Sequence, residues 1–202
     1  SRAMKPEEKR LAQKNGHAYT EIPIARDAIA IIVNPKNPIQ SLSLKQLELI
    51  YTGKISNWHD LQSTLPSKKI ILFSRESSSG TYEYFQEFVL KKNDFALSAR
   101  LIPSSSSIVD TVAQDDWAIG YVGLGFVKDV GSRVKTLSVK PATGAKAIFP
   151  SVASVINGQY PVSRALYLYV TQLAKPRAMP FITFCKSQKG QSIVEKAGFV
   201  PL

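Results

Sequence analysis

The chain has 202 residues, of which 44% are hydrophobic and 20% charged, and this composition excludes a disordered protein. Twenty-six Lys and Arg against fifteen Asp and Glu give a net charge of +11. That surplus favours an anionic partner, and it equally serves solubility. The basic residues are scattered and carry no zinc-knuckle, helix-turn-helix or RNA-binding signature, so we expect no nucleic acid partner.

The supply of reactive side chains is small. Cys185 is the only cysteine, and the two histidines, His17 and His59, lie far apart without the spacing of metal ligands. We therefore expect no disulfide, no metal and no cofactor. No apolar run approaches the ~20 residues that span a bilayer, and the first residues lack the apolar stretch of a signal peptide.

The first third of the chain predicts a helix, a strand and a second helix. Residues 5–14 form a short charged helical pattern, and the nearly continuous β-branched run at 24–34 predicts a buried strand. Ser43 with Gln46 makes a capping box at the start of the next helix, and Gly53 supplies its stop.

The rest of the chain continues the alternation of strands and helices. The run KKIILF at residues 68–73 predicts a second buried strand. The helix that follows it has Tyr82, Phe85, Phe88 and Val89 on one face. Further strands are predicted at 99–105, 117–127 and 159–170, with helices at 105–114, capped through Ser107 and Asp110, and at 180–202. This alternation favours the α/β class with a largely parallel sheet.

The segment SRESSSGT, residues 74–81, is the strongest candidate site. It joins the end of a strand to the start of a helix, where the first N–H groups lack intrahelical partners and an anion is stabilised. Gly80 allows close approach of a ligand, Ser79 and Thr81 add hydroxyl donors, and Arg75 adds a planar charged fork. The pattern alone leaves two interpretations open, an anion cradle and an ordinary helix cap beside a surface arginine.

Other catalytic motifs fail on their own spacing. The loop has no phosphate-binding G-x-x-x-x-G-K-[ST] pattern and no G-x-S-x-G nucleophile elbow. A serine hydrolase needs a histidine beside the serine, and His59 is expected on a surface turn. The serine tract at 104–107 offers a second helix N-terminus, for which simple capping is the favoured interpretation.

Several segments, taken in order, resemble one known family. They are SRAMKPEE, IARDAIAIIVNPKNP, LSLKQLELIYTGKISNW, SRESSSGTYEYF, WAIGYVGLGFV, YPVSRALYLYV and GQSIVEKAGFVPL. Together they are similar to periplasmic phosphate-binding proteins of phosphate ABC transporters, of the type II periplasmic-binding-protein class. The resemblance implies a two-lobed α/β protein with mixed sheets flanked by helices. Residues 1–67 and 161–202 would form lobe one, and 68–160 would form lobe two with the anion loop.

The same resemblance implies the ligand and its contacts. Phosphate would be held without covalent chemistry by Arg75, Ser79, Gly80 and Thr81, so we expect no enzyme. Ser1 and Arg2 are two further candidate contacts. Arg2 stands where family members carry an aspartate that discriminates against sulfate. Two alternatives remain: binding of another oxyanion such as sulfate, and a ligand-free sensory or interaction domain on the same fold. A serine-dependent hydrolase ranks below both.

The resemblance also implies what lies around the chain. The family's lobe one opens with a segment that carries its own serine- and threonine-rich anion loop, and this sequence begins after it. We therefore expect an incomplete first lobe, completed by a separate segment or chain. The expected partners are an ABC-transporter permease or a sensor. The expected location is periplasmic or extracellular, with membrane association through a missing N-terminal segment as a further hypothesis.

Overall fold

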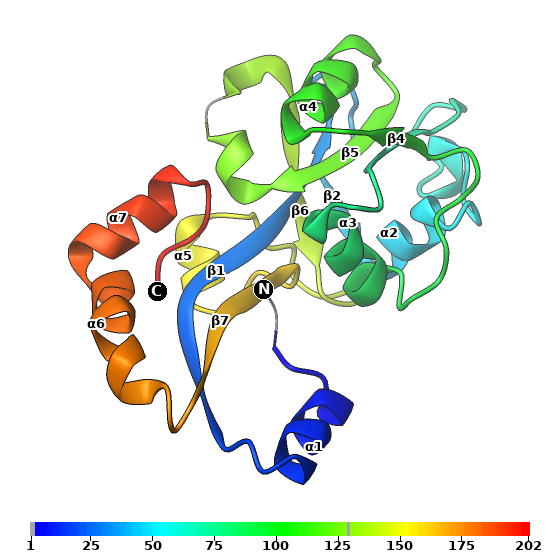
Figure 1. The fold of residues 1–202 in the computed structure, drawn as a ribbon. Helices are drawn as coiled ribbons and strands as arrows, with labels where there is room; N and C mark the ends of the chain where they lie inside the picture. The colour runs from blue at the N-terminus through cyan, green and yellow to red at the C-terminus, as the bar shows by residue number, and fades with distance from the viewer. Residues whose placement is uncertain (1–2, 129) are drawn as a thin grey trace.

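The computed structural model describes residues 3–128 and 130–202, and it has the α/β architecture that the sequence predicts (Figure 1). The described helices and strands follow in this order: α1 Pro6–Lys14, β1 Tyr19–Val33, β2 Ser41–Ser43, α2 Leu44–Tyr51, η1 Trp58–Asp60, β3 Ile71–Arg75, α3 Gly80–Tyr84, η2 Phe85–Val89, β4 Arg100–Ile102, α4 Ser105–Gln114, β5 Ala118–Gly123, η3 Leu124–Val127, η4 Gly131–Arg133, β6 Lys135–Lys140, α5 Val152–Ile156, β7 Ser163–Thr171, α6 Lys175–Lys186 and α7 Gln188–Lys196.

The long strand β1 organises the sheet. Its first part pairs with β7, from Tyr19 opposite Thr171 to Ala28 opposite Ser163. Its last part, residues 29–33, lies between β5 and β6 and is buried on both faces. The β-branched run explains this placement, because such side chains suit a strand covered on both sides. Figure 1 shows β1 running from the β7 ribbon into the sheet beneath α4.

The sheet is mixed, with strand order β2-β6-β1-β5-β3-β4 and β7 attached to β1. Strand β1 is antiparallel to β5, β6 and β7, whereas β3 is parallel to both β4 and β5 and β2 is parallel to β6. The expectation of a largely parallel sheet is therefore wrong, and the mixed sheet implied by the family resemblance is correct. Alternation of strands and helices does not specify which strands become neighbours.

An aromatic cluster fixes the helix that follows the anion loop. The rings of Phe85 and Tyr121 stack 4.0 Å apart, and Tyr51 meets Phe85 edge-on at 4.8 Å. All three side chains are fully buried. Offset and edge-on aromatic pairs stabilise a core beyond simple burial, so the loop before Phe85 is mounted on a rigid base.

The helical segment after the loop contains a wide turn that the sequence did not predict. Residues 85–89 form a π-helical turn, and the amide of Leu90 donates to the carbonyl of Phe85 at 3.2 Å. The extra residue in this turn rotates the following side chains. Phe85 and Val89 are buried as predicted, but Phe88 is 41% exposed, so its assignment to the same face is wrong.

The main core crosses the predicted boundary between the lobes. Leu47 and Trp58, from the segment assigned to lobe one, pack in one cluster with Leu72, Phe85 and Tyr121 from the segment assigned to lobe two. The division at residues 67/68 and 160/161 stays a prediction. The packing joins residues on both sides of the first boundary in a single body.

A buried carboxylate stabilises the same body. Glu48 on α2 is 6% exposed and pairs with Lys45 at 2.9 Å and Lys91 at 3.1 Å. Hydrogen bonds from Lys45 and then from Lys91 lower the pKa of Glu48. The ion pairs therefore connect α2 to the end of the helix that follows the anion loop.

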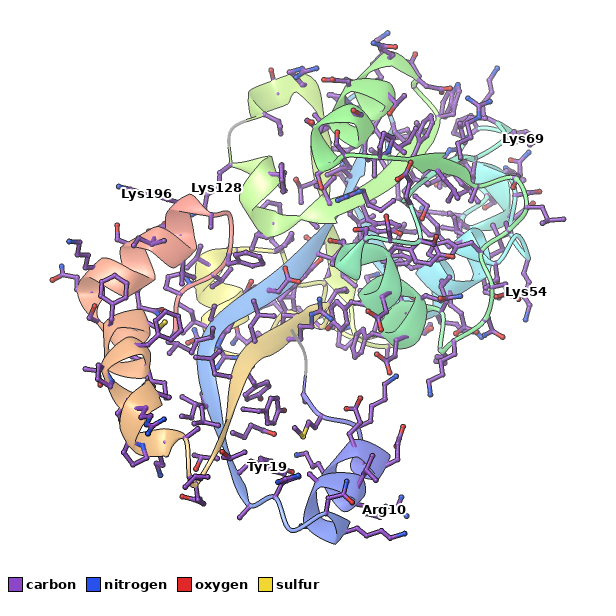
Figure 2. All side chains as sticks on the ribbon, viewed as in Figure 1. Arg10, Tyr19, Lys54, Lys69, Lys128 and Lys196 are labelled. Atoms are coloured by element: carbon purple, nitrogen blue, oxygen red, sulfur yellow. The ribbon has the colours of Figure 1, made fainter. Side chains whose placement is uncertain are left out.

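Positive charge is spread over the molecule. Figure 2 shows Arg10, Lys54, Lys69, Lys128 and Lys196 projecting from its outer edges, on different elements of the fold. This distribution agrees with the scattered basic residues of the sequence. Within the described residues, no helix is both long and apolar enough to cross a membrane.

Candidate anion site

The turn after β3 brings Ser79, Gly80 and Thr81 together at the start of α3. Ser79 caps the helix, because its hydroxyl accepts from the amide of Thr81 at 3.2 Å. The amide of Ser79 donates to the carbonyl of Glu76 at 2.9 Å, which closes the turn. The amides of Ser79 and Thr81 are thus used within the turn, and the Gly80 amide and the hydroxyls of Ser79 and Thr81 are the candidate donors to an anion.

Arg75, the last residue of β3, is held by neutral partners. Its Nη1 donates to the Ser105 hydroxyl at 2.9 Å and its Nη2 to the Pro103 carbonyl at 3.0 Å. Its Nε is buried and has no partner within the described part of the chain. No carboxylate of residues 3–128 or 130–202 forms an ion pair with Arg75. The guanidinium is therefore fixed in orientation while its charge stays available to a ligand.

The strand pairing explains how Ser105 reaches Arg75. Strands β3 and β4 are parallel neighbours, with Arg75 opposite Ile102. Their two serine-rich loops therefore follow at the same edge of the sheet, where ligands bind in open α/β sheets. The sequence pattern predicts both serine-rich loops but does not predict that they lie side by side. The missing information was that the two strands are adjacent.

The cap of α4 differs from the expected one. Ser104 is the capping residue, and its hydroxyl accepts from the amide of Ser107 at 3.0 Å. Ser107 lies inside the helix, and Asp110 forms an ion pair with Arg133. The predicted cap through Ser107 and Asp110 is therefore displaced by one turn, because the serine tract offers several equivalent capping positions.

A buried hydroxyl pair fixes the end of β3 behind the loop. The hydroxyls of Ser74 and Tyr121 are hydrogen-bonded at 2.7 Å, and Ser74 also donates to the carbonyl of Arg75 at 3.2 Å. Burial raises the pKa of Tyr121, so its hydroxyl keeps its proton at neutral pH. Sequence analysis did not identify this pair, since both residues lie in apolar runs.

A second arginine contacts the loop from the other side. Nη2 of Arg164, on β7, lies 3.4 Å from the carbonyl oxygen of Gly80 and 3.4 Å from Oδ2 of Asp27. Its guanidinium carbon stands 4.4 Å from the centre of the Tyr84 ring. Burial raises the pKa of Asp27, and the charge of Arg164 opposes that rise. The sequence signal was available, because Asp27 and Arg164 interrupt otherwise apolar strands.

Two groups of candidate residues stand apart from this site. Ser1 and Arg2 lie outside the described residues. His59 belongs to η1, where its Nδ1 is 3.0 Å from the Leu65 carbonyl, and His17 follows α1; both side chains are exposed. Neither position supports the histidine–serine pair that a hydrolase needs.

A cavity of about 440 Å³ competes with the loop as a candidate site. It lies between α4, η3 and the end of α7, in the region where Figure 2 labels Lys128 and Lys196. Of the three cations that line it, two are already paired, Lys128 with Glu195 at 2.9 Å and Arg133 with Asp110. The third, Lys196, projects from the outer edge of the molecule (Figure 2). An anion would have to displace these carboxylates, so the loop with its unpaired Arg75 is the better candidate.

Many known proteins are similar to this chain in sequence and in fold. The PBP superfamily domain matches residues 1–189. The phosphate-binding protein PstS of Pseudomonas aeruginosa is 36% identical over 217 residues, covering 100% of this chain and 66% of the relative. A possible phosphate-binding protein from Planctomyces limnophilus superposes with a TM-score of 0.86 at 27% identity, covering 100% of this chain and 74% of the other.

A third relative carries a ligand in its crystal. A phosphate ABC transporter substrate-binding protein from Clostridium perfringens, solved with bound phosphate, has a TM-score of 0.73 at 32% identity and covers 100% of this chain and 77% of its own. The present chain spans 61% to 66% of the length of the curated relatives that it matches.

Proposed function

The chain belongs to the PBP superfamily, as its motifs predicted, and we propose that it binds inorganic phosphate non-covalently in a cleft between two lobes. In this proposal the protein serves a phosphate ABC transporter or a phosphate sensor. The observation that carries it is the state of Arg75. Ser105 and Pro103 orient its guanidinium, and no carboxylate of the described residues forms an ion pair with it. Arg75 is the last residue of β3, the strand that leads into the loop.

The loop would divide the oxygens of phosphate among several donors. Arg75 supplies the planar charged fork, which matches two oxygens of a tetrahedral anion. The hydroxyls of Ser79 and Thr81, with the amide of Gly80, supply neutral donors at the helix start. None of these contacts requires proton transfer or a covalent bond, and the superfamily is one of solute-binding proteins rather than enzymes.

The two-lobe organisation remains part of the proposal, with both boundaries of lobe two changed. Because β1 pairs with β7 as far as Ala28 and Ser163, and then enters the main sheet, we place lobe two at residues 29–162. Residues 1–28 and 163–202 would form part of lobe one. The chain then crosses between the lobes through β1 and β7, rather than near residue 67.

We further propose that a segment outside these 202 residues completes lobe one. Three apolar side chains on that side are exposed: Leu11 at 58%, Leu173 at 92% and Phe181 at 61%. Covering such side chains is favourable at about 25 cal/mol per Å² of apolar surface. The same segment would bring the second set of anion donors. Periplasmic or extracellular location, a permease or sensor as partner, and membrane association through that segment belong to the same proposal.

Calorimetry on the full-length gene product tests the function. Phosphate, arsenate and sulfate are titrated into the wild type, Arg75→Ala and Arg100→Ala. Arg100 is the matched control, because it lies over the Phe73 ring at the start of β4, away from the loop. Loss of even one charged hydrogen bond, about 1.5–3 kcal/mol, should weaken phosphate binding by roughly 10- to 150-fold, and this loss should occur in Arg75→Ala alone. Equal affinity in all three proteins would show that the site is elsewhere.

The competing functions give different results in the same series. Tighter binding of sulfate than phosphate would favour another oxyanion, and no binding of any anion would favour a sensory or interaction domain. Turnover of a chromogenic phosphate ester that disappears in Ser79→Ala would favour a hydrolase. None of these results is expected, because the loop offers an unpaired cation and neutral donors but no adjacent histidine.

A further inference from the structure

Asp27 and Arg164 form a charged pair at the point where β1 changes partners. They are opposite each other in the register of β1 and β7, and the next pair, Ala28 with Ser163, is the last of that ladder. From Ile29 onward β1 pairs with β5 instead. The pair therefore marks the junction between the β1–β7 ribbon and the main sheet.

The pair is mostly buried. Only 17% of the Arg164 side chain and 13% of the Asp27 side chain are exposed. Taking two charges out of water costs several kcal/mol per ion, and their attraction repays this only when further hydrogen bonds are made. An apolar pair would join two strands at lower cost. The third contact of the guanidinium, to the carbonyl of Gly80, shows what the charge adds.

That carbonyl belongs to the peptide group that carries the Thr81 amide. The peptide unit is planar, so fixing the Gly80 oxygen also fixes the direction of the Thr81 N–H. The Tyr84 ring, 4.4 Å from the guanidinium, restrains Arg164 from the next turn of the same helix. Asp27 neutralises the charge of Arg164, so the arginine can support the loop without competing with Arg75 for the anion.

We propose that Arg164 is a positioning residue of the anion loop, which holds the Gly80–Thr81 peptide in the orientation in which the Thr81 amide donates to the Ser79 hydroxyl oxygen, so that this hydroxyl can direct its own proton to the ligand. This inference rests on the proposed phosphate site. It connects that site to β7, one of the two strands that cross between the proposed lobes. A displacement of the β1–β7 ribbon against the sheet is therefore transmitted to the loop through a single side chain.

The test uses the full-length gene product in three variants. Arg164→Gln removes the charge, Arg164→Lys retains the charge without the planar fork, and Arg100→Gln is a control arginine that also lies over an aromatic ring. Phosphate affinity is measured by calorimetry. Hydrogen exchange of the Thr81 and Glu83 amides is measured by NMR without any anion, because the Glu83 amide donates to Ser79 in the first turn.

We expect Arg164→Gln to weaken phosphate binding by about tenfold and to accelerate exchange at both amides. Arg164→Lys should restore part of both, and Arg100→Gln should match the wild type. A purely structural role would lower the unfolding temperature. It would leave the exchange rates of the Thr81 and Glu83 amides unchanged relative to those of the amides in the sheet.

The outcomes separate this inference from the proposed function. If the wild type binds phosphate and Arg164→Gln binds it within twofold with unchanged exchange, Arg164 is not a positioning residue. If the wild type binds no phosphate, the proposed function is wrong, and the anion-free exchange rates still decide whether Arg164 orders the loop. Should Arg164→Gln fail to fold, the comparison of Arg164→Lys with the wild type decides by the same criteria.

Discussion

Replacing Asp27 by Asn would remove one negative charge from beside the anion loop while keeping the size of the side chain. In the structure, Arg164 is also held by the Gly80 carbonyl and the Tyr84 ring, so it should stay in place without the carboxylate. Its positive charge would then be unbalanced. We therefore expect Asp27→Asn to bind phosphate more tightly than the wild type.

The size of this effect follows from the geometry. Oδ2 of Asp27 and the carbonyl oxygen of Gly80 lie within about 7 Å of each other, because Nη2 of Arg164 is 3.4 Å from both. We take about 8 Å as the distance between the carboxylate and an anion on the loop, and the repulsion follows from Coulomb's law at that distance. A dianion at that distance in water is repelled by about 1 kcal/mol before screening. Screening leaves about 0.8 kcal/mol at 0.01 M salt and about 0.4 kcal/mol at 0.15 M.

Binding should therefore tighten by about fourfold at 0.01 M salt and about twofold at 0.15 M. These values are lower bounds, since partial burial of the pair reduces the local dielectric. The assay is calorimetry at pH 8, where Asp27 is ionised although burial raises its pKa. Asp116→Asn is the control, because Asp116 also forms an ion pair, with Lys36, but lies beyond the far end of α4.

Three results would refute the reasoning. Weaker binding in Asp27→Asn, by several-fold or more, would mean that the carboxylate is needed to hold Arg164 against the loop. A gain that does not change with salt would mean that the effect is not electrostatic. An equal gain in Asp116→Asn would assign it to the net charge of the protein instead of the loop.

Three further changes test the scaffold by chemical denaturation. Gly125→Ala would place a Cβ about 2.2 Å from the backbone after α7 and should cost about 1–3 kcal/mol or more, whereas Gly123→Ala makes only ordinary contact with its neighbours and should cost less than half as much. Tyr121→Phe should cost about 1–2 kcal/mol by removing the buried hydrogen bond between Tyr121 and Ser74, which leaves the Ser74 hydroxyl with the Arg75 carbonyl alone, and unchanged stability would contradict that role. Hydrogen bonds from Lys45 and Lys91 lower the pKa of Glu48, so its contribution to the free energy of unfolding is full above the pKa of the unfolded glutamate and is lost as the pH falls toward the folded value. In Glu48→Gln the free energy of unfolding should therefore decline less steeply from about pH 5 downward. Parallel pH curves for the wild type and the variant would show that Glu48 does not cause this decline.

Local features of the fold could be predicted because each depends on neighbouring residues. The capping box of Ser43 and Gln46 has both hydrogen bonds, and Gly53 takes the positive φ of +77° that ends α2. The apolar run at 24–34 is a buried strand, with its beginning extended to Tyr19. The partners of that strand could not be predicted, because residues that form a strand do not specify its neighbours.

The local geometry of the candidate site was predictable to the same extent. Arg75, Ser79, Gly80 and Thr81 are close in sequence, and the structure places the last three in one turn. Their supporting contacts come from distant segments, such as Ser105 on α4. These depend on the adjacency of β3 with β4 and of β1 with β7, which local patterns do not contain. Charged residues inside apolar strands were the available signal for the distant members.

Arg75 and Arg164, which flank the anion loop, differ in whether their charge is paired with a carboxylate. Among the described residues Arg75 has only neutral partners, so in the proposed site its charge serves the anion, while Arg164 is paired with Asp27 and is proposed to orient the loop. If both were unpaired, their mutual repulsion in a partly buried site would oppose the folding of the empty loop. If both were paired, the anion would have to compete with a carboxylate. The net charge of +11 therefore says little about affinity. Affinity should follow one uncompensated guanidinium and the donors that a paired arginine holds in place.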